Sequence, residues 1–237
     1  GLGDVYKRQC LVCGPVTLAS VFAEVDGQRP HVTRQWLFLV PCALGALGLF
    51  LARRAGDGTP GFYWATAFTA VVYALAWWLW GDREAFAGPR KLLDVLRGTL
   101  IGASLAVVFV LGALVVQHIP LLAGPAAELL QTPNKGGYFL TLLVLVVNGA
   151  GEEMVFRDVV PRQLRGMGQS VVQAGVWSTL AYCLVTCVMG VPLLVFAAGA
   201  LGAVTYYESV KTGRLYSPIA AHLTWSIGML LILPQFF

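Results

Sequence analysis

Long apolar segments alternate with short polar ones along most of this chain. A helix that spans a membrane needs about 20 mostly apolar residues, and eight segments come close to that length. They lie near residues 10–24, 35–52, 61–80, 99–117, 138–156, 171–188, 191–207 and 216–233. The pattern therefore predicts an all-α fold, that of a polytopic membrane protein with about eight transmembrane helices.

Three segments do not fit this alternation. Residues 1–9, GLGDVYKRQ, are polar and unlike the apolar residues after them, so we interpret them as a non-native or linker remnant and expect residues 10–237 to form a single membrane domain. Residues 83–98 mix Leu and Val with Arg and Lys, which predicts an amphipathic helix lying on the membrane surface. Residues 122–137 are rich in Gly and Pro and predict a loop with a short helical turn.

The composition supports a membrane protein and argues against a soluble one. Hydrophobic residues make up 57% of the chain and charged residues only 12%, whereas soluble domains carry roughly a quarter charged residues. The net charge of +4 is small, and we interpret it as loop charge that sets topology. We therefore expect membrane lipid around the chain and no nucleic-acid partner.

The distribution of Lys and Arg between the loops predicts an orientation. Loops on the side that comes after the first, third, fifth and seventh expected spans carry eleven of these residues, and the opposite side carries three. The richer side holds Arg29, Arg34, Arg83, Arg90, Lys91, Arg97, Arg157, Arg162, Arg165, Lys211 and Arg214; the other holds Arg53, Arg54 and Lys135. The richer side should be cytoplasmic. We expect a plasma membrane of the bacterial type.

One expected span carries charged residues in its interior. The stretch NGAGEEMVFRDVV, residues 148–160, comes after ten residues without a charge, and charged groups persist in a membrane only when they are paired or functional. Glu153 and Arg157 are four residues apart and share a helix face. Glu152 is turned about 100° away from Glu153, which suits a general base acting on water. In the alternative interpretation, both glutamates simply neutralise Arg157.

The last expected span carries two further polar residues, His222 and Ser226, one helical turn apart. Helix rise places Glu152 roughly 20 Å, and His222 roughly 9 Å, from the cytoplasmic ends of their helices. Glu152, His222 and Ser226 are therefore expected to converge in the cytoplasmic half of the membrane, in a water-filled cavity.

These segments resemble those of a known family. GEEMVFR resembles the EExxxR motif of the CPBP intramembrane endopeptidases, which include CAAX prenyl proteases and bacteriocin-processing enzymes, although Asp158 stands where Gly is common. Residues 196–226 are similar to the family's Gly-rich helix, its TG-x-L turn, its Pro-Ile pair and the His after that pair. The resemblance covers about residues 138–233, the motif-bearing core.

The resemblance implies roles for individual residues. Glu152 would activate water, Glu153 and Arg157 would support the site, and His222 would bind the developing oxyanion. The family's second motif is Phe-x-x-x-His, and Tyr182 and Thr186 stand at its two positions in this chain. Ser226 stands where the family has Asn or Asp. Thr and Ser can hydrogen-bond a water or an oxyanion, but neither can take a proton near pH 7.

The residues and the resemblance leave three functional hypotheses open. The first is an intramembrane endopeptidase, a hydrolase that cuts a hydrophobic or prenylated peptide or protein by Glu-activated water on the cytoplasmic side. The second is a catalytically silent relative that binds or regulates a membrane partner. The third is an ion-coupled transporter, against which stands the absence of an inverted repeat and of paired broken helices. No cofactor is expected, and no metal, because the chain has no HExxH and lacks the family's second histidine.

Overall fold

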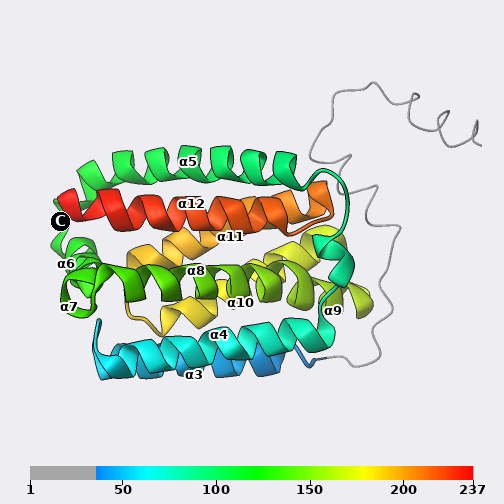
Figure 1. Ribbon diagram of the computed structural model, residues 1–237, viewed down its shortest axis with the longest axis horizontal. Coiled ribbons are helices and arrows are strands. Elements are labelled where there is room, and N and C mark those ends of the chain that lie inside the picture. The colour runs from blue at the N-terminus through cyan, green and yellow to red at the C-terminus, as the bar shows by residue number, and fades with distance from the viewer. Residues whose placement is uncertain (1–35, 237) are drawn as a thin grey trace, which may run out of the picture.

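The computed structural model describes residues 36–236, and this part of the chain consists of helices joined by short loops, without strands (Figure 1). Its α-helices are α3 (Leu39–Ala55), α4 (Pro60–Trp80), α5 (Lys91–Val116), α6 (Pro120–Leu130), α7 (Thr132–Gly136), α8 (Tyr138–Met154), α9 (Val160–Gly166), α10 (Val171–Cys187), α11 (Pro192–Thr212) and α12 (Tyr216–Ile232). A π-helical turn, η2 (Val155–Val159), joins α8 to α9, and short 3₁₀ helices occupy Arg83–Phe86 and Leu233–Gln235.

The predicted fold class is confirmed. Seven of the eight expected spans coincide with helices, and the span expected at 10–24 lies outside the described residues. Five of the described helical segments are long and apolar enough to cross a membrane, namely Pro60–Trp80, Lys91–Val116, Tyr138–Gly166, Pro192–Thr212 and Tyr216–Gln235. Helix α10 is apolar but shorter. The chain is therefore an all-α polytopic membrane protein.

Two local predictions were wrong. The surface helix expected at 83–98 does not form, because α5 already begins at Lys91 and continues into the membrane span. Two charged residues in the first turns of α5 pair with residues of α11 and of the turn after it. Arg97 donates to Glu208 at 2.5 and 2.8 Å, and Asp94 pairs with Arg214. The loop expected at 122–137 is instead mostly helical, in α6 and α7, each of which has Pro in its first turn.

Helix α8 lies in the middle of the bundle and carries the charged motif at one end. It packs against α4 on one side and α12 on the other, while α5 covers α12 and α3 covers α4 (Figure 1). The loop after α4, helix α9 and the turn between α11 and α12 gather at the same end of the bundle, and α6 and α7 lie at the opposite end (Figure 1). This arrangement places the motif between helices from distant parts of the sequence.

The outer face of α5 exposes large apolar side chains. Leu100 is 69% exposed, Val108 62% and Leu111 60%. Contiguous apolar surface of this kind is unstable in water, whereas lipid tails cover it at no cost. The exposed faces therefore fit a helix bundle that is surrounded by lipid.

Helices α5 and α12 pack at close range through two glycines. A methyl group built on Gly98 would collide with the backbone carbonyl of Ser217, and one on Gly102 with that of Ala221. Small residues four apart allow two membrane helices to approach each other in this way. Because α12 carries His222, this contact also fixes one wall of the candidate site.

The glycine contact leads to a first prediction. Gly102→Val should lower the free energy of unfolding by about 1–3 kcal/mol, because the new side chain meets backbone that cannot move aside. Gly112→Val on the same helix is the matched control, since a Cβ there has nothing within 4 Å. Thermal unfolding in detergent micelles measures both variants. Equal losses of stability would mean that β-branching in α5, rather than its contact with α12, is responsible.

Candidate active site

The charged motif lies where α8 passes into the π-helical turn. Glu152 and Glu153 stand on the last turn of α8, and Arg157 stands inside η2. π-helical turns are rare and often occur at functional sites. The turn leaves the predicted pair in contact, with Glu153 Oε2 3.2 Å from Arg157 Nε. Both side chains are fully buried.

Glu153 connects two helices through its two oxygens. Oε2 faces Arg157, and Oε1 lies 2.7 Å from His222 Nδ1 on α12. An ionised carboxylate only accepts hydrogen bonds, so Nδ1 donates, and the other ring nitrogen, Nε2, points elsewhere. A carboxylate in this position fixes the orientation of the imidazole ring.

Further buried contacts hold Arg157 in place. Its Nε donates to Thr205 Oγ1 on α11 at 2.6 Å, and its guanidinium lies 5.1 Å from the centre of the Tyr182 ring on α10. The carbonyl of Phe156, its neighbour in the π-helical turn, accepts from Arg157 Nη1 and from Ser178 Oγ. Arg157 therefore ties α8, α10 and α11 together around one buried charge.

Glu152 lies on the same turn as Glu153 and reaches side chains of α10 and α12. Its Oε2 accepts a hydrogen bond from the Tyr182 hydroxyl at 2.6 Å and lies 3.7 Å from His222 Nε2. The Glu152 side chain retains 16% exposure, whereas Glu153 has none. The two glutamates thus share His222 but contact different nitrogens of its ring. Glu153 also pairs with Arg157, and Glu152 also accepts from Tyr182.

A glycine of α8, Gly149, faces α12 beside the cluster. A Cβ on Gly149 would lie 3.1 Å from Leu223 Cδ2 and 3.5 Å from the His222 ring. The distance to the ring is an ordinary van der Waals contact, so Gly149 lies directly against the part of α12 that carries His222.

The structure brings five of the seven predicted site residues into one connected cluster: Glu152, Glu153, Arg157, Tyr182 and His222. Thr186 is buried one turn beyond Tyr182, and its hydroxyl donates to the Tyr182 carbonyl at 2.8 Å, within its own helix. Ser226 lies one turn beyond His222 and lines a neighbouring cavity. The catalytic roles of all these residues stay predictions.

That cavity is apolar and has a volume of about 590 Å³. Its walls come mainly from Leu, Val, Ala and Phe side chains of α5, α8, α11 and α12. Its polar lining residues are Thr66, Thr132, Thr141, Asn148, Trp225 and Ser226. Asn148 Oδ1 and Trp225 Nε1 are buried there, and neither atom has a hydrogen-bond partner among the described residues. Of the three residues expected to share a water-filled cavity, only Ser226 lines this apolar one, and Glu152 and His222 do not.

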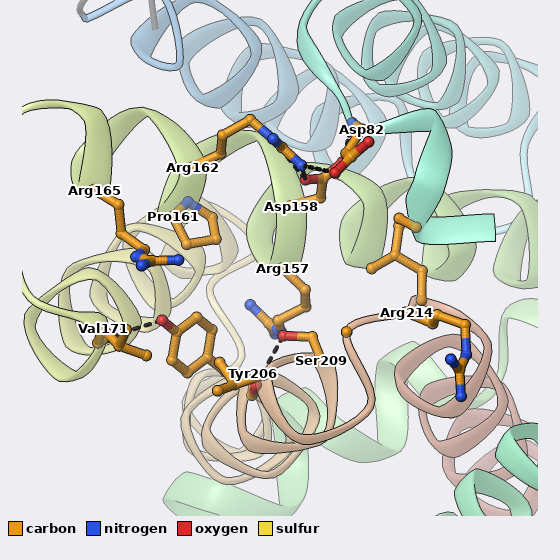
Figure 2. Close-up of a pocket in the computed structure, with 14 residues that line it drawn as sticks. Asp82, Arg157, Asp158, Pro161, Arg162, Arg165, Val171, Tyr206, Ser209 and Arg214 are labelled. Atoms are coloured by element: carbon orange, nitrogen blue, oxygen red, sulfur yellow. Dashed lines mark hydrogen bonds and ion pairs between the residues drawn. The ribbon is translucent and has the colours of Figure 1, made fainter. Parts of the chain in front are cut away.

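A second pocket, of about 410 Å³, opens at the charged end of the bundle. Figure 2 shows four arginines around it, Arg157, Arg162, Arg165 and Arg214, together with Asp82 and Asp158. Arg157 lines this pocket and also contacts Glu153, so it belongs both to the charged pocket and to the buried cluster.

Asp158, the residue that replaces the family's usual Gly, has a structural explanation. Its carboxylate accepts from Trp77 Nε1 at 2.9 Å and from the Asp82 backbone N–H at 2.7 Å. It also accepts from Arg162 at 3.0 Å (Figure 2). Asp82 in turn pairs with Arg162 at 2.6 Å. Burial tends to raise the pKa of Asp82, but hydrogen bonds from Arg162 and Glu84 bring that pKa below its ordinary value. Asp158 thus fastens the loop after α4 to the motif helix.

Sequence reasoning missed several residues of the site. Asn148 stands in the stretch NGAGEEMVFRDVV, one turn before Glu152, and its polarity in an apolar run is a usable signal. Thr205, Ser178 and Trp225 carry no such signal, because single Thr, Ser and Trp residues are common in membrane helices. Across residues 36–236, no group of three or more His, Cys, Asp or Glu side chains is arranged to hold a metal ion.

Comparison with known proteins gave a match to one part of the chain. Residues 134–228 match the family model described as type II CAAX prenyl endopeptidase Rce1-like. Searches of curated proteins and of solved structures gave no match. The matched segment runs from α7 through most of α12 and contains every residue of the buried cluster. The match at residues 134–228 supports the assignment of this integral membrane protein as a CPBP family membrane protease.

Proposed function

We propose that this protein is an intramembrane endopeptidase that hydrolyses a peptide bond of a hydrophobic or prenylated peptide by means of water activated by Glu152. The observation that carries the proposal is the 3.7 Å separation of Glu152 Oε2 and His222 Nε2, with the imidazole fixed from behind by Glu153. A base and an oxyanion donor must stand this close to act on one carbonyl group.

In this mechanism Glu152 takes a proton from a water molecule, and the resulting hydroxide attacks the carbonyl carbon of the scissile bond. The carbonyl oxygen becomes an oxyanion, which accepts a hydrogen bond from His222 Nε2 in its protonated form. Glu153 balances the charge of the imidazolium through Nδ1. The oxyanion then re-forms the carbonyl as the C–N bond breaks, and protonated Glu152 gives its proton to the leaving amine, which restores the carboxylate of Glu152.

The apolar cavity supports the substrate class. Its volume of about 590 Å³ falls in the range of small-molecule sites, and its walls suit a lipid chain or apolar side chains. Asn148 and Trp225 carry buried polar atoms that a peptide backbone could satisfy. Lys and Arg are more numerous at the end of the bundle that carries the charged motif, which supports an orientation with that end in the cytoplasm.

The direct test is cleavage of a peptide panel by the purified protein in liposomes. Each apolar peptide is supplied with and without a farnesyl or geranylgeranyl group on a cysteine near its C-terminus, and products are identified by mass spectrometry. The proposal expects one defined cut per substrate, faster for at least one class of apolar peptide. A folded protein that cuts no peptide of the panel would refute the endopeptidase proposal.

The cavity gives a prediction about affinity. Ala200→Leu, which places a larger side chain on the cavity wall, should raise the KM for apolar substrates by about tenfold with little change in kcat, because it removes volume used for binding. Ala203→Leu on the exposed side of the same helix is the matched control. Steady-state kinetics on the best peptide of the panel measure KM and kcat for both variants and for the unaltered protein. An unchanged KM in Ala200→Leu would mean that substrate does not enter the cavity.

One observation favours a second candidate, a catalytically silent relative that binds a membrane partner. Thr186 stands where the family has the His that assists the base, and its hydroxyl donates within its own helix. In this case the cluster would serve stability alone. The peptide panel separates the two, because a silent relative binds peptides without cutting them.

A further inference from the structure

The position that assists the base in this family is occupied here by a threonine, yet Glu152 has a close hydrogen-bond partner. The Tyr182 hydroxyl, one turn earlier on α10, donates to Glu152 Oε2 at 2.6 Å. We propose that Tyr182 is a positioning residue that takes over part of the role of the missing imidazole by holding the Glu152 carboxylate in place for its reaction with water. This inference rests on the proposed function.

The surroundings of Tyr182 suit this role. The side chain is 6% exposed, its ring centre lies 5.0 Å from that of Phe156, and the guanidinium of Arg157 lies over the ring at 5.1 Å. Thr186 Oγ1 is bound to the Tyr182 carbonyl and is not available to Glu152. Packing around the ring therefore holds the phenol oxygen in place, and the Thr186 hydroxyl donates to a backbone carbonyl instead of to Glu152.

The oxygen of Glu152 that Tyr182 contacts also fits the positioning role. Tyr182 and His222 both approach Oε2 of Glu152, so the second carboxylate oxygen is the one left to take a proton from water. A hydrogen bond to a carboxylate is short and strong, and it removes rotational freedom from a flexible side chain. A phenol donates to Glu152 but does not exchange protons near neutral pH. Tyr182 thus orients the base without acting as an acid or base itself.

Tyr182→Phe removes one oxygen atom and retains the ring. We expect kcat to fall by about 10–100-fold with KM changed less than twofold, because a hydrogen bond to a charged group is lost while the substrate cavity is untouched. Tyr206→Phe is the matched control: its buried hydroxyl donates at 2.6 Å to the Val171 carbonyl, away from Glu152. Its kcat should stay near that of the unaltered protein. A Tyr182→Phe protein that cleaves at the unaltered rate would overturn the inference.

An infrared measurement separates this inference from the proposed function. The carboxyl stretching band of Glu152, identified by its disappearance in Glu152→Gln, should shift in Tyr182→Phe and stay in place in Tyr206→Phe. A band that does not move in Tyr182→Phe overturns the inference, whatever the activity. If the unaltered protein cuts no peptide, the endopeptidase proposal fails by itself, and a shifted band still identifies Tyr182 as the residue that holds Glu152.

Discussion

Glu152→Gln should lower the rate of peptide cleavage by about 10²–10⁴ and leave the protein folded. The amide has nearly the same shape as the carboxylate, and its oxygen can still accept the hydrogen bond from Tyr182. It cannot take a proton from water. Removing the charge relieves a costly burial, so the stability of this variant should be equal to that of the unaltered protein or higher.

The measurement is the initial rate on the best peptide of the panel, after thermal unfolding has established that each variant is folded. Glu128→Gln makes the same chemical change on α6, where the carboxylate is 57% exposed and pairs with Arg53. That control should cleave at the unaltered rate. Cleavage by Glu152→Gln at the rate of the control would rule out Glu152 as the base, and with it the proposed mechanism.

The helices could be predicted from sequence because membrane helices have a strong signal. A segment such as residues 99–117 is apolar over its whole length, and only a helix satisfies its backbone in lipid. The prediction failed where charged residues found buried partners. Lys91 to Gly98 has the composition of a surface helix, but Arg97 and Asp94 pair with Glu208 and Arg214, which are more than a hundred residues away.

Part of the candidate site could also be predicted. The i,i+4 rule predicted the contact of Glu153 with Arg157, and the contact forms although Arg157 stands in the π-helical turn after α8. That Glu152 and His222 meet was expected from depth and from the family resemblance, and the structure separates their nearest atoms by 3.7 Å. Each of these expectations used local geometry or a motif that stands in the sequence.

The rest depends on packing between distant helices. Sequence spacing gives no sign that His222 binds Glu153 through one nitrogen and faces Glu152 with the other. The family resemblance makes Tyr182 a replacement for a Phe, and only the placement of α10 reveals that its hydroxyl reaches Glu152. The apolar cavity is likewise a property of several helices together.

Arg157→Ala should destabilise the protein by about 3–5 kcal/mol, which is the usual effect of removing one partner from a buried ion pair. The substitution leaves the Glu153 carboxylate fully buried, with His222 as its remaining charged or polar partner. It also takes away the donor to Thr205 and the cation above the Tyr182 ring. Three helices lose a common contact at once, so the loss should exceed that in Gly102→Val.

Arg54→Ala is the matched control, because Arg54 is exposed at the end of α3, where its guanidinium lies 6.0 Å from the Phe50 ring centre. Thermal unfolding in micelles and the yield of folded protein in membranes measure both changes. We expect Arg54→Ala to remain within about 0.5 kcal/mol of the unaltered protein. If Arg157→Ala were as stable as Arg54→Ala, Glu153 would be uncharged in the folded protein and would need no cation. His222 would then lack the carboxylate that balances its charge in the proposed mechanism, and oxyanion binding by an imidazolium would have to be abandoned.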